Sequence, residues 1–243
     1  MFGAAARSAS IVVTPSEHSA RRILERWPGS VVRVIPWPAS PDKPSRILPL
    51  EGRPTKVLVV ASTDSHKRLE MGLSVLARLR ASNPSLIATF VTRPGNAEDR
   101  FLRMVHQVDP KSSWISLMSG VSEEQLAHEY GSAKILLVPS LDEGFCLPVI
   151  EAAKYGTPTV HVDRGALPEV APWPGARGGT NDADDEALLL SRAKLLMEDG
   201  AAWQAAHEHA LNIPSRFASA DFIDAWQEVV EVVTGENRNT ARK

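Results

Sequence analysis

The 243-residue chain has little of what disulfide scaffolds, membrane proteins and nucleic-acid binders need. Its single cysteine, Cys146, excludes an internal disulfide and a cysteine-rich zinc module. No stretch approaches 18 consecutive apolar residues, and the first 13 residues lack the apolar core of a signal peptide. The chain has 27 Lys and Arg residues and 29 Asp and Glu residues, so it lacks the basic excess that is typical of proteins that bind nucleic acids. We therefore expect a cytoplasmic protein.

The common catalytic motifs are also absent. No Gly-x-Gly-x-x-Gly follows a strand, no phosphate-binding Gly-x4-Gly-Lys-Ser/Thr occurs, and there is no Gly-x-Ser-x-Gly nucleophile turn. His207 and His209 fall on nearly opposite sides of a predicted helix, so they are poor co-ligands for a metal. A dinucleotide site, a phosphate-binding loop, a serine hydrolase and a metal centre are thus unsupported.

Apolar patterns along the chain alternate between strand and helix. This alternation predicts an α/β fold, a Rossmann-like parallel sheet with helices on both faces. Ser16 is expected to cap the first helix, and Ser122 with Gln125 forms a capping-box pattern. The predicted strands are 10–14, 32–35, 56–61, 86–92, 114–118, 135–138 and 159–162, and the predicted helices are 17–27, 67–81, 97–107, 122–130, 148–156, 182–198, 201–211 and 220–233.

A proline-rich segment interrupts this pattern. Six prolines between residues 36 and 54 cannot sustain a helix or a central strand, so they indicate a linker. The predicted organisation is a strand–helix–strand over 1–43, a linker over 44–55, an α/β domain over 56–218, and a last helix with a polar, frayed tail over 219–243.

The strongest functional signal is PSLDEGFCLPVIE, residues 139–151. It follows a predicted buried strand and opens a helix, which is where ligands bind in parallel α/β sheets. Backbone N–H groups at such a helix start favour an anion such as phosphate. Glu143 and Glu151 can accept hydrogen bonds from hydroxyls, so the segment fits a diphosphate flanked by two sugars. The alternative interpretation is two ordinary acidic residues near a helix start, and the spacing alone does not separate the two.

The segment EGFCLPVIEAAKYGTPTV, residues 143–160, resembles the signature of the family-4 glycosyltransferases, retaining enzymes with the GT-B fold. Glu143 and Glu151 match the family's Glu-x7-Glu pattern. Segments 120–130, 133–140 and 164–170 are similar to its flanking blocks, in order and spacing. The resemblance covers about residues 56–235, and 10–38 resembles the end of the family's acceptor-side domain. It implies a C-terminal donor-binding domain with a truncated N-terminal domain.

The resemblance also implies a reaction and its residues. A hexose would pass, with retention, from a UDP- or GDP-sugar to a saccharide or glycolipid acceptor. Lys67 would neutralise the diphosphate and Glu143 would contact the transferred sugar, both as catalytic residues, while Glu151 would bind the ribose hydroxyls. No cofactor and no metal are implied, because a cation and a helix end take the place of Mg²⁺. The diphosphate and sugar would be held at Gly144, Phe145, Cys146 and Leu147.

Two positions depart from the family's pattern. Ser62 stands where the family often has an arginine, so we expect Ser62 and the nearby His66 at the donor site without that second cation. Cys146 stands where the family commonly has glycine, and its side chain either narrows the sugar pocket or fills space.

The short N-terminal part leaves other functions open. One strand–helix–strand cannot form a doubly wound sheet, so we expect either that the chain is a fragment or that a second chain supplies the acceptor half. The alternatives are a non-catalytic nucleotide-sugar-binding subunit and an inactive truncated homologue. Arg21, Arg22 and Arg26 fit either a helix on the inner membrane face, meeting a lipid-linked acceptor, or a solvated surface. The resemblance implies polysaccharide or glycolipid assembly there.

Overall fold

The computed structural model describes residues 8–42, 44–172 and 181–235. The chain divides into two compact units. One unit combines the residues up to Asp42 with those from Ser215 onward, and the other spans Lys43–Pro214. The tail over 236–243, expected to be frayed, lies outside the described residues. No helix in the described part is long and apolar enough to cross a membrane.

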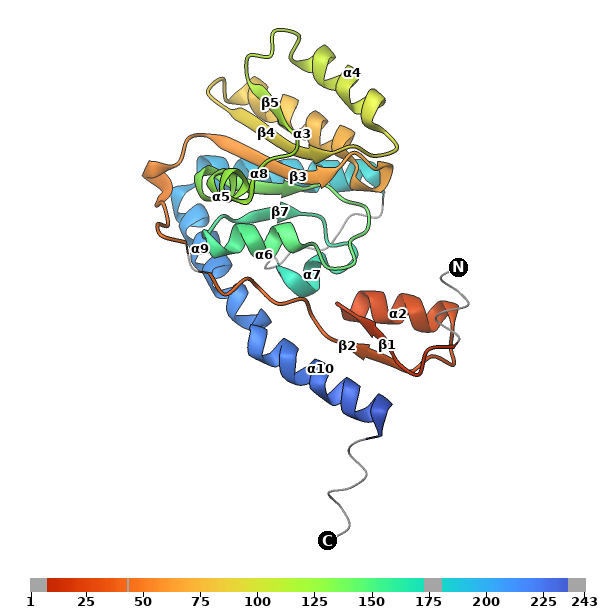
Figure 1. Ribbon diagram of the computed structural model, residues 1–243. Coiled ribbons are helices and arrows are strands. Elements are labelled where there is room, and N and C mark those ends of the chain that lie inside the picture. The colour runs from red at the N-terminus through yellow and green to blue at the C-terminus, as the bar shows by residue number, and fades with distance from the viewer. Residues whose placement is uncertain (1–7, 43, 173–180, 236–243) are drawn as a thin grey trace. The chain divides into compact units, whose positions relative to one another are not determined.

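The larger unit contains a five-stranded parallel sheet with the strand order β5-β4-β3-β6-β7 (Figure 1). In the central strand, Val57 pairs with Ala88 on one side and with Ile135 on the other. Apolar β-branched runs suit such a strand because both of its faces are buried. The predicted α/β class is confirmed. The strands are β3 (Lys56–Ser62), β4 (Ile87–Arg93), β5 (Ile115–Met118), β6 (Ile135–Val138) and β7 (Thr159–His161).

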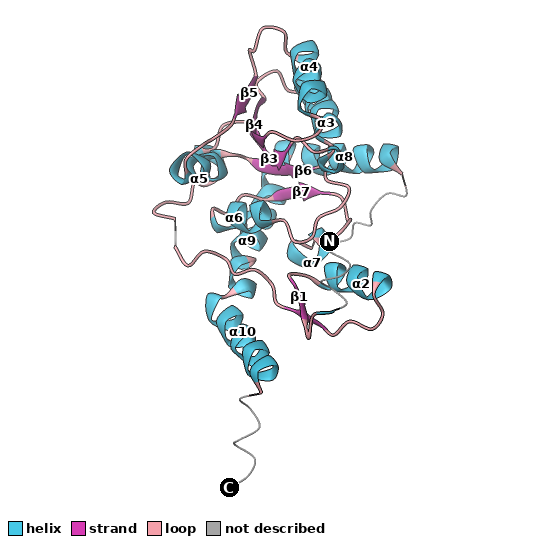
Figure 2. Ribbon diagram, turned by 45° about the vertical axis from the view of Figure 1, so that its right-hand side comes forward, coloured by secondary structure: helices cyan, strands magenta, loops and turns pink. Residues whose placement is uncertain are grey.

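The helices cover both faces of this sheet. The chain runs outward from β3 to β5, returns across β3 to β6, and continues to β7. Right-handed crossovers in opposite directions place helices on opposite faces. Figure 2 shows α3, α4 and α8 on one side and α5 and α6 on the other. The helices are α3 (Leu69–Ser82), α4 (Glu98–Val108), α5 (Glu123–Ser132), α6 (Leu147–Lys154), α7 (Leu167–Val170), α8 (Asp182–Glu198) and α9 (Gly200–Asn212).

The main core lies between the sheet and the α3, α4 and α8 face. Val57 and Val59 belong to it because alternate side chains of a strand point to the same face. Phe90 of β4 packs against Phe101 of α4, with ring centroids 5.1 Å apart. Trp203 of α9 is fully buried at the edge of this core, and its indole N–H donates to the Lys134 carbonyl at 2.7 Å.

Local signals in the sequence account for several helix starts. The capping box predicted at Ser122 and Gln125 is present at the start of α5. Asn181 and Asp199 cap α8 and α9 with their side chains alone, each accepting two backbone N–H groups. Short helical turns were not predicted, because one turn carries no periodic pattern; these are α7 and the 3₁₀ turns Leu50–Gly52, Ser65–Lys67 and Pro214–Phe217.

The predicted start of the helix after β3 was wrong by two residues. Lys67 ends a 3₁₀ turn, and α3 begins only at Leu69. Between them Arg68 has left-handed backbone angles, with φ at 47°, which breaks the helix. Lys67 therefore sits on a loop at the end of β3 and not on the helix itself.

The smaller unit has a two-stranded parallel sheet, β1 (Val12–Thr14) with β2 (Val32–Val34), joined by α2 (Glu17–Arg26). Ser16 caps α2 as predicted. This unit also contains α10 (Ser219–Thr234). An ion pair of 3.4 Å joins Arg33 of β2 to Glu228 of α10.

Candidate active site

The predicted site residues gather where the strand order reverses. The connections that follow β3 and β6, two neighbouring parallel strands, leave in opposite directions. Such a switch point leaves a crevice at the carboxyl ends of the strands, where ligands bind. The loop after β3 and the loop after β6 meet there, since the Leu141 N–H donates to the His66 carbonyl at 2.9 Å.

Lys67 and Glu143 form the centre of the site. The Lys67 Nζ donates to both Glu143 carboxylate oxygens, at 2.9 and 2.8 Å. The Glu143 side chain is buried, and the Lys67 side chain is one-fifth exposed. A two-pronged, charge-assisted contact of this kind is stronger than a neutral hydrogen bond. Without a ligand, the carboxylate therefore neutralises the cation to which the family resemblance gives the diphosphate.

The loop after β7 fixes the backbone of Glu143. The Ala166 N–H donates to the Glu143 carbonyl at 2.8 Å. Gly165 has a φ of 61°, and a Cβ there would lie 2.5 Å from the Glu143 nitrogen. Only glycine permits this backbone to come so close. Three loops, after β3, β6 and β7, thus meet at one residue, Glu143: Lys67 contacts its carboxylate, and the loop after β7 contacts its backbone.

The start of α6 lies beside this pair. Gly144 and Leu147 are exposed and Phe145 is buried. Cys146 immediately precedes α6 with left-handed backbone angles and a φ of 71°. Burial raises the pKa of the Cys146 thiol, and the Glu143 carboxylate raises it further. At neutral pH this shift favours the protonated thiol, which is not the nucleophilic form of cysteine.

Glu151 lies one turn inside α6 and is half-buried. Its Oε2 accepts a hydrogen bond of 2.6 Å from the Tyr130 hydroxyl, at the end of α5. Burial, and next the Glu151 charge, raise the pKa of Tyr130, so the hydroxyl remains a donor. The sequence analysis missed Tyr130. The sequence held part of this signal, because α5 and α6 were both predicted; they share a face because the connections from β5 to β6 and from β6 to β7 run in the same direction.

Ser62 and His66 lie at the rim of the site. The Ser62 hydroxyl donates to Asp64 at 2.8 Å, and the other Asp64 oxygen accepts the Asn96 N–H at 3.2 Å. The Ser62 and Asn96 hydrogen bonds lower the pKa of Asp64. His66 is exposed. Asp64 and Asn96, which the sequence analysis did not single out, tie the loop after β3 to the loop after β4.

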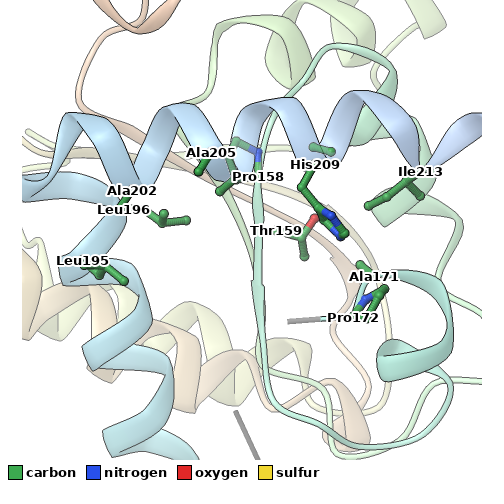
Figure 3. A pocket seen from close by; sticks show the side chains of 12 residues that line it. Pro158, Thr159, Ala171, Pro172, Leu195, Leu196, Ala202, Ala205, His209 and Ile213 are labelled. Atoms are coloured by element: carbon green, nitrogen blue, oxygen red, sulfur yellow. The ribbon is translucent and has the colours of Figure 1, made fainter. Parts of the chain in front are cut away.

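A separate apolar cavity of about 450 Å³ lies between α8, α9 and the amino end of β7 (Figure 3). Thr159, Leu196 and Ile213 contribute to its lining, together with His209, and among the described residues no Lys, Arg, Asp or Glu lines it. This part of its wall therefore offers a diphosphate no charged side chain. His207 and His209, which the sequence made poor co-ligands, have different surroundings. His209 lines the cavity, whereas Nδ1 of His207 lies 2.6 Å from the Gly156 carbonyl oxygen. Within the described residues no three His, Cys, Asp or Glu side chains gather as a metal site.

The model of the family "Glycosyl transferases group 1" matches residues 42–195, more than half of the chain. The chain belongs to the group 1 glycosyltransferases. The matched residues include all three loops that meet at Glu143, together with α6.

Among its relatives, the MMP alpha-(1->4)-mannosyltransferase of Mycolicibacterium hassiacum is 33% identical over 194 residues, which are 77% of this chain and 46% of that protein. The serotype-specific mannosyltransferase WbdA of Escherichia coli is 26% identical over 168 residues, 68% of this chain and 20% of WbdA. This group 1 glycosyltransferase chain thus spans between one fifth and about half of the length of these relatives.

The fold is similar to that of solved glycosyltransferases. The pneumococcal O-GlcNAc transferase GtfA, crystallised with UDP and GlcNAc, matches with a TM-score of 0.75 at 18% identity. The match covers 94% of this chain and 46% of GtfA. The GT-B type of fold, which the resemblance implied, is confirmed by this likeness.

Proposed function

We propose that this chain binds the nucleotide-diphosphate sugar for a retaining, family-4-type transfer of a hexose to a saccharide or glycolipid acceptor. The observation that supports this most is the Lys67–Glu143 ion pair at the carboxyl ends of β3 and β6. Two residues 76 positions apart in the sequence meet where a phosphate and a sugar would lie side by side. The donor is a UDP- or GDP-sugar, and no metal is needed.

Each group has a separate task in this proposal. Lys67 exchanges its carboxylate partner for the donor diphosphate and stabilises the negative charge that grows on the leaving group. The start of α6, from Gly144 to Leu147, holds the phosphates and the sugar with backbone groups. Glu143, released from Lys67, accepts hydrogen bonds from hydroxyls of the transferred sugar. Glu151, oriented by Tyr130, accepts those of the ribose.

The remaining proposed residues shape the rim. Ser62 and His66 lie beside the donor, and Cys146 narrows the space next to the sugar. With Ser62 in place of a second cation, Lys67 carries the diphosphate charge together with the helix start. Binding is therefore expected to weaken only modestly with salt, since a single cation that is one-fifth exposed contributes most of the side-chain attraction.

The experiment is calorimetric titration of the chain with UDP and with GDP, without added metal. We expect binding of one nucleotide in the micromolar range. Glu151→Ala should weaken it by roughly tenfold or more, because ribose hydroxyls lose a charged acceptor. Glu143→Gln should tighten binding of the bare nucleotide several-fold, on the order of 1 kcal/mol, because Lys67 is freed. Unchanged affinity in the Glu151 variant would contradict the assignment.

The acceptor half is proposed to come from a further polypeptide segment. In the smaller unit, Ile223, Trp226 and Val230 of α10 are between 39% and 52% exposed. A two-stranded sheet and an open apolar helix face need more partners than this unit contains. This observation also favours the second candidate function, a non-catalytic nucleotide-sugar-binding subunit. Sugar transfer by the isolated chain would exclude this second candidate, because a non-catalytic subunit has no activity of its own.

The proposed setting is the cytoplasm, with peripheral contact at the inner membrane face where lipid-linked acceptors lie. Helix α2 exposes Arg21, Arg22 and Arg26, which suits an anionic lipid surface. Polysaccharide or glycolipid assembly is the proposed process.

A further inference from the structure

Arg68, the residue after Lys67, is a buried cation that the proposed transfer does not use. It is 8% exposed and has left-handed backbone angles with a φ of 47°. Both features are costly: burying a charge requires partners, and a side chain with Cβ disfavours this backbone region. We propose that Arg68, acting through Asp185, is the positioning residue that holds Lys67 and Glu143 in register; this inference rests on the proposed function.

The guanidinium of Arg68 joins three segments. Its Nε donates to the Pro139 carbonyl at 2.8 Å, in the loop after β6. Its Nη1 donates to Asp185 at 2.9 Å and to Asp182 at 2.8 Å, in the first turn of α8. The planar fork of an arginine can serve such partners simultaneously, which a lysine cannot. The loop that carries Lys67 is thereby fastened to the loop that leads to Glu143.

Asp185 is the common anchor of the loops at this edge. It is fully buried, and its Oδ2 also accepts the Arg164 Nε at 2.7 Å. Arg164 precedes Gly165, the residue that lies against the Glu143 backbone. The loops after β3 and β7 are thus both held by one carboxylate oxygen, while the other oxygen, Oδ1, has no hydrogen-bond partner among the residues that the structure describes. A fully buried charge with an unsatisfied oxygen is a stability cost that an apolar pair would avoid.

This arrangement places the two site residues by their neighbours. Lys67 is the residue before Arg68. Arg68 also binds the Pro139 carbonyl, four residues before Glu143 in the same loop. Two hydrogen bonds report directly on the register: Leu141 N–H to the His66 carbonyl, 2.9 Å, and Ala166 N–H to the Glu143 carbonyl, 2.8 Å. Neither involves Arg68 itself, so they measure its effect on the loops.

The first test is hydrogen exchange of the full chain without ligand. Arg68→Gln should speed exchange of the Leu141 and Ala166 amides by roughly tenfold or more, with the amides of central β6 unchanged. The matched control is Glu129→Gln, which breaks the similarly buried 2.9 Å pair with Lys56 at the opposite, amino end of β3. If exchange of these two amides is accelerated equally in both variants, Arg68 contributes only to general stability and the proposal is overturned.

Two further variants separate the side chain from the backbone. Arg68→Gly relieves the left-handed backbone but removes the guanidinium, so we expect fast exchange despite the easier turn. Arg68→Lys keeps the charge and one contact, so exchange should fall between wild type and glycine. Slow, wild-type-like exchange in the glycine variant would show that position 68 needs only the turn, which overturns the proposal.

The second test is titration of the same variants with UDP and GDP. Arg68→Gly should weaken nucleotide binding about tenfold, with partial rescue in Arg68→Lys, whereas Glu129→Gln stays within about twofold of wild type. Equal weakening in the Arg68 and Glu129 variants contradicts the positioning role. A wild-type chain that binds neither nucleotide defeats the proposed function, and the claim that Arg68 serves a donor site fails with it. The exchange data then decide separately whether Arg68 holds the loops.

Discussion

Single residues in left-handed backbone conformations explain one departure from the family's pattern. Cys146 stands where glycine is common, and its φ of 71° shows why glycine suits this position. The turn aims the backbone of the loop after β6 into the start of α6. From the sequence, only the side chain could be considered, as a filler of space or as a constriction of the sugar pocket. The backbone angle adds a third consequence, which is local strain.

Cys146→Gly is therefore expected to raise the free energy of unfolding by roughly 0.5–1 kcal/mol, the strain relieved less the added entropy of the unfolded chain. Urea denaturation measures this. Cys146→Ala is the matched control, because it removes the sulfur but keeps the strained backbone. A glycine variant no more stable than the alanine variant would show that the left-handed turn costs nothing here.

Among the secondary-structure elements, β5 depends on a single carboxylate at its start. Asp109, after α4, accepts the N–H groups of Ser113, Trp114 and Ile115, all at 2.9 Å. Burial opposes the ionised form, but these hydrogen bonds outweigh it and lower the pKa of Asp109 to about 2. The ordinary value is 3.8, so the folded chain holds this proton more weakly than the unfolded chain.

The sign of the resulting pH effect follows from that difference. Stability from Asp109 is fully present above about pH 4 and is lost as the pH falls toward about 2. Asp109→Asn should lower the free energy of unfolding at pH 6 by about 1–3 kcal/mol and flatten its decline below pH 4. Denaturant titrations at several pH values measure both. Asp224→Asn, at an exposed position of α10, should leave the curve unchanged. An unaltered decline in the Asp109 variant would contradict this account.

Elements with a clear apolar pattern could be predicted from the sequence, whereas single helical turns could not. The predicted strand 135–138 coincides with β6, because a fully apolar run ending at Pro139 has few alternatives. The start of α3 was misplaced because nothing in the local pattern reveals that Arg68 takes a left-handed conformation. That conformation is held by Asp185, which lies 117 residues away in the chain.

For the whole molecule, the two compact units differ in the core they contain. The larger unit holds the apolar core around the five-stranded sheet. In the smaller unit, Val31 is 57% exposed and Val233 is 54% exposed. The two strands and two helices described in this unit bury too little apolar surface for independent stability. The smaller unit should therefore open more readily.

Hydrogen exchange resolved by peptide should detect this difference. Amides in β1, β2 and α10 are expected to exchange at least about tenfold faster than those in β3 and β6, because local opening exposes few buried contacts. Peptides from α8 and α9 are the internal control for helices in the larger unit. Equal protection in both units would contradict the prediction. Protection of α10 that rises with protein concentration would identify a second copy as its cover.

The sequence by itself determined the α/β class and the succession of strands and helices, and it singled out segment 139–151 as the candidate site. These are local properties: apolar periodicity, capping residues and proline positions act over a few residues. Only the tertiary structure decided that Lys67 pairs with Glu143, that Tyr130 orients Glu151, and that Arg68 and Arg164 share Asp185. Such contacts arise when the crossing of the chain between β5 and β6 brings distant loops to one edge of the sheet. The spacing of these residues in the sequence does not show how close they lie in the folded chain.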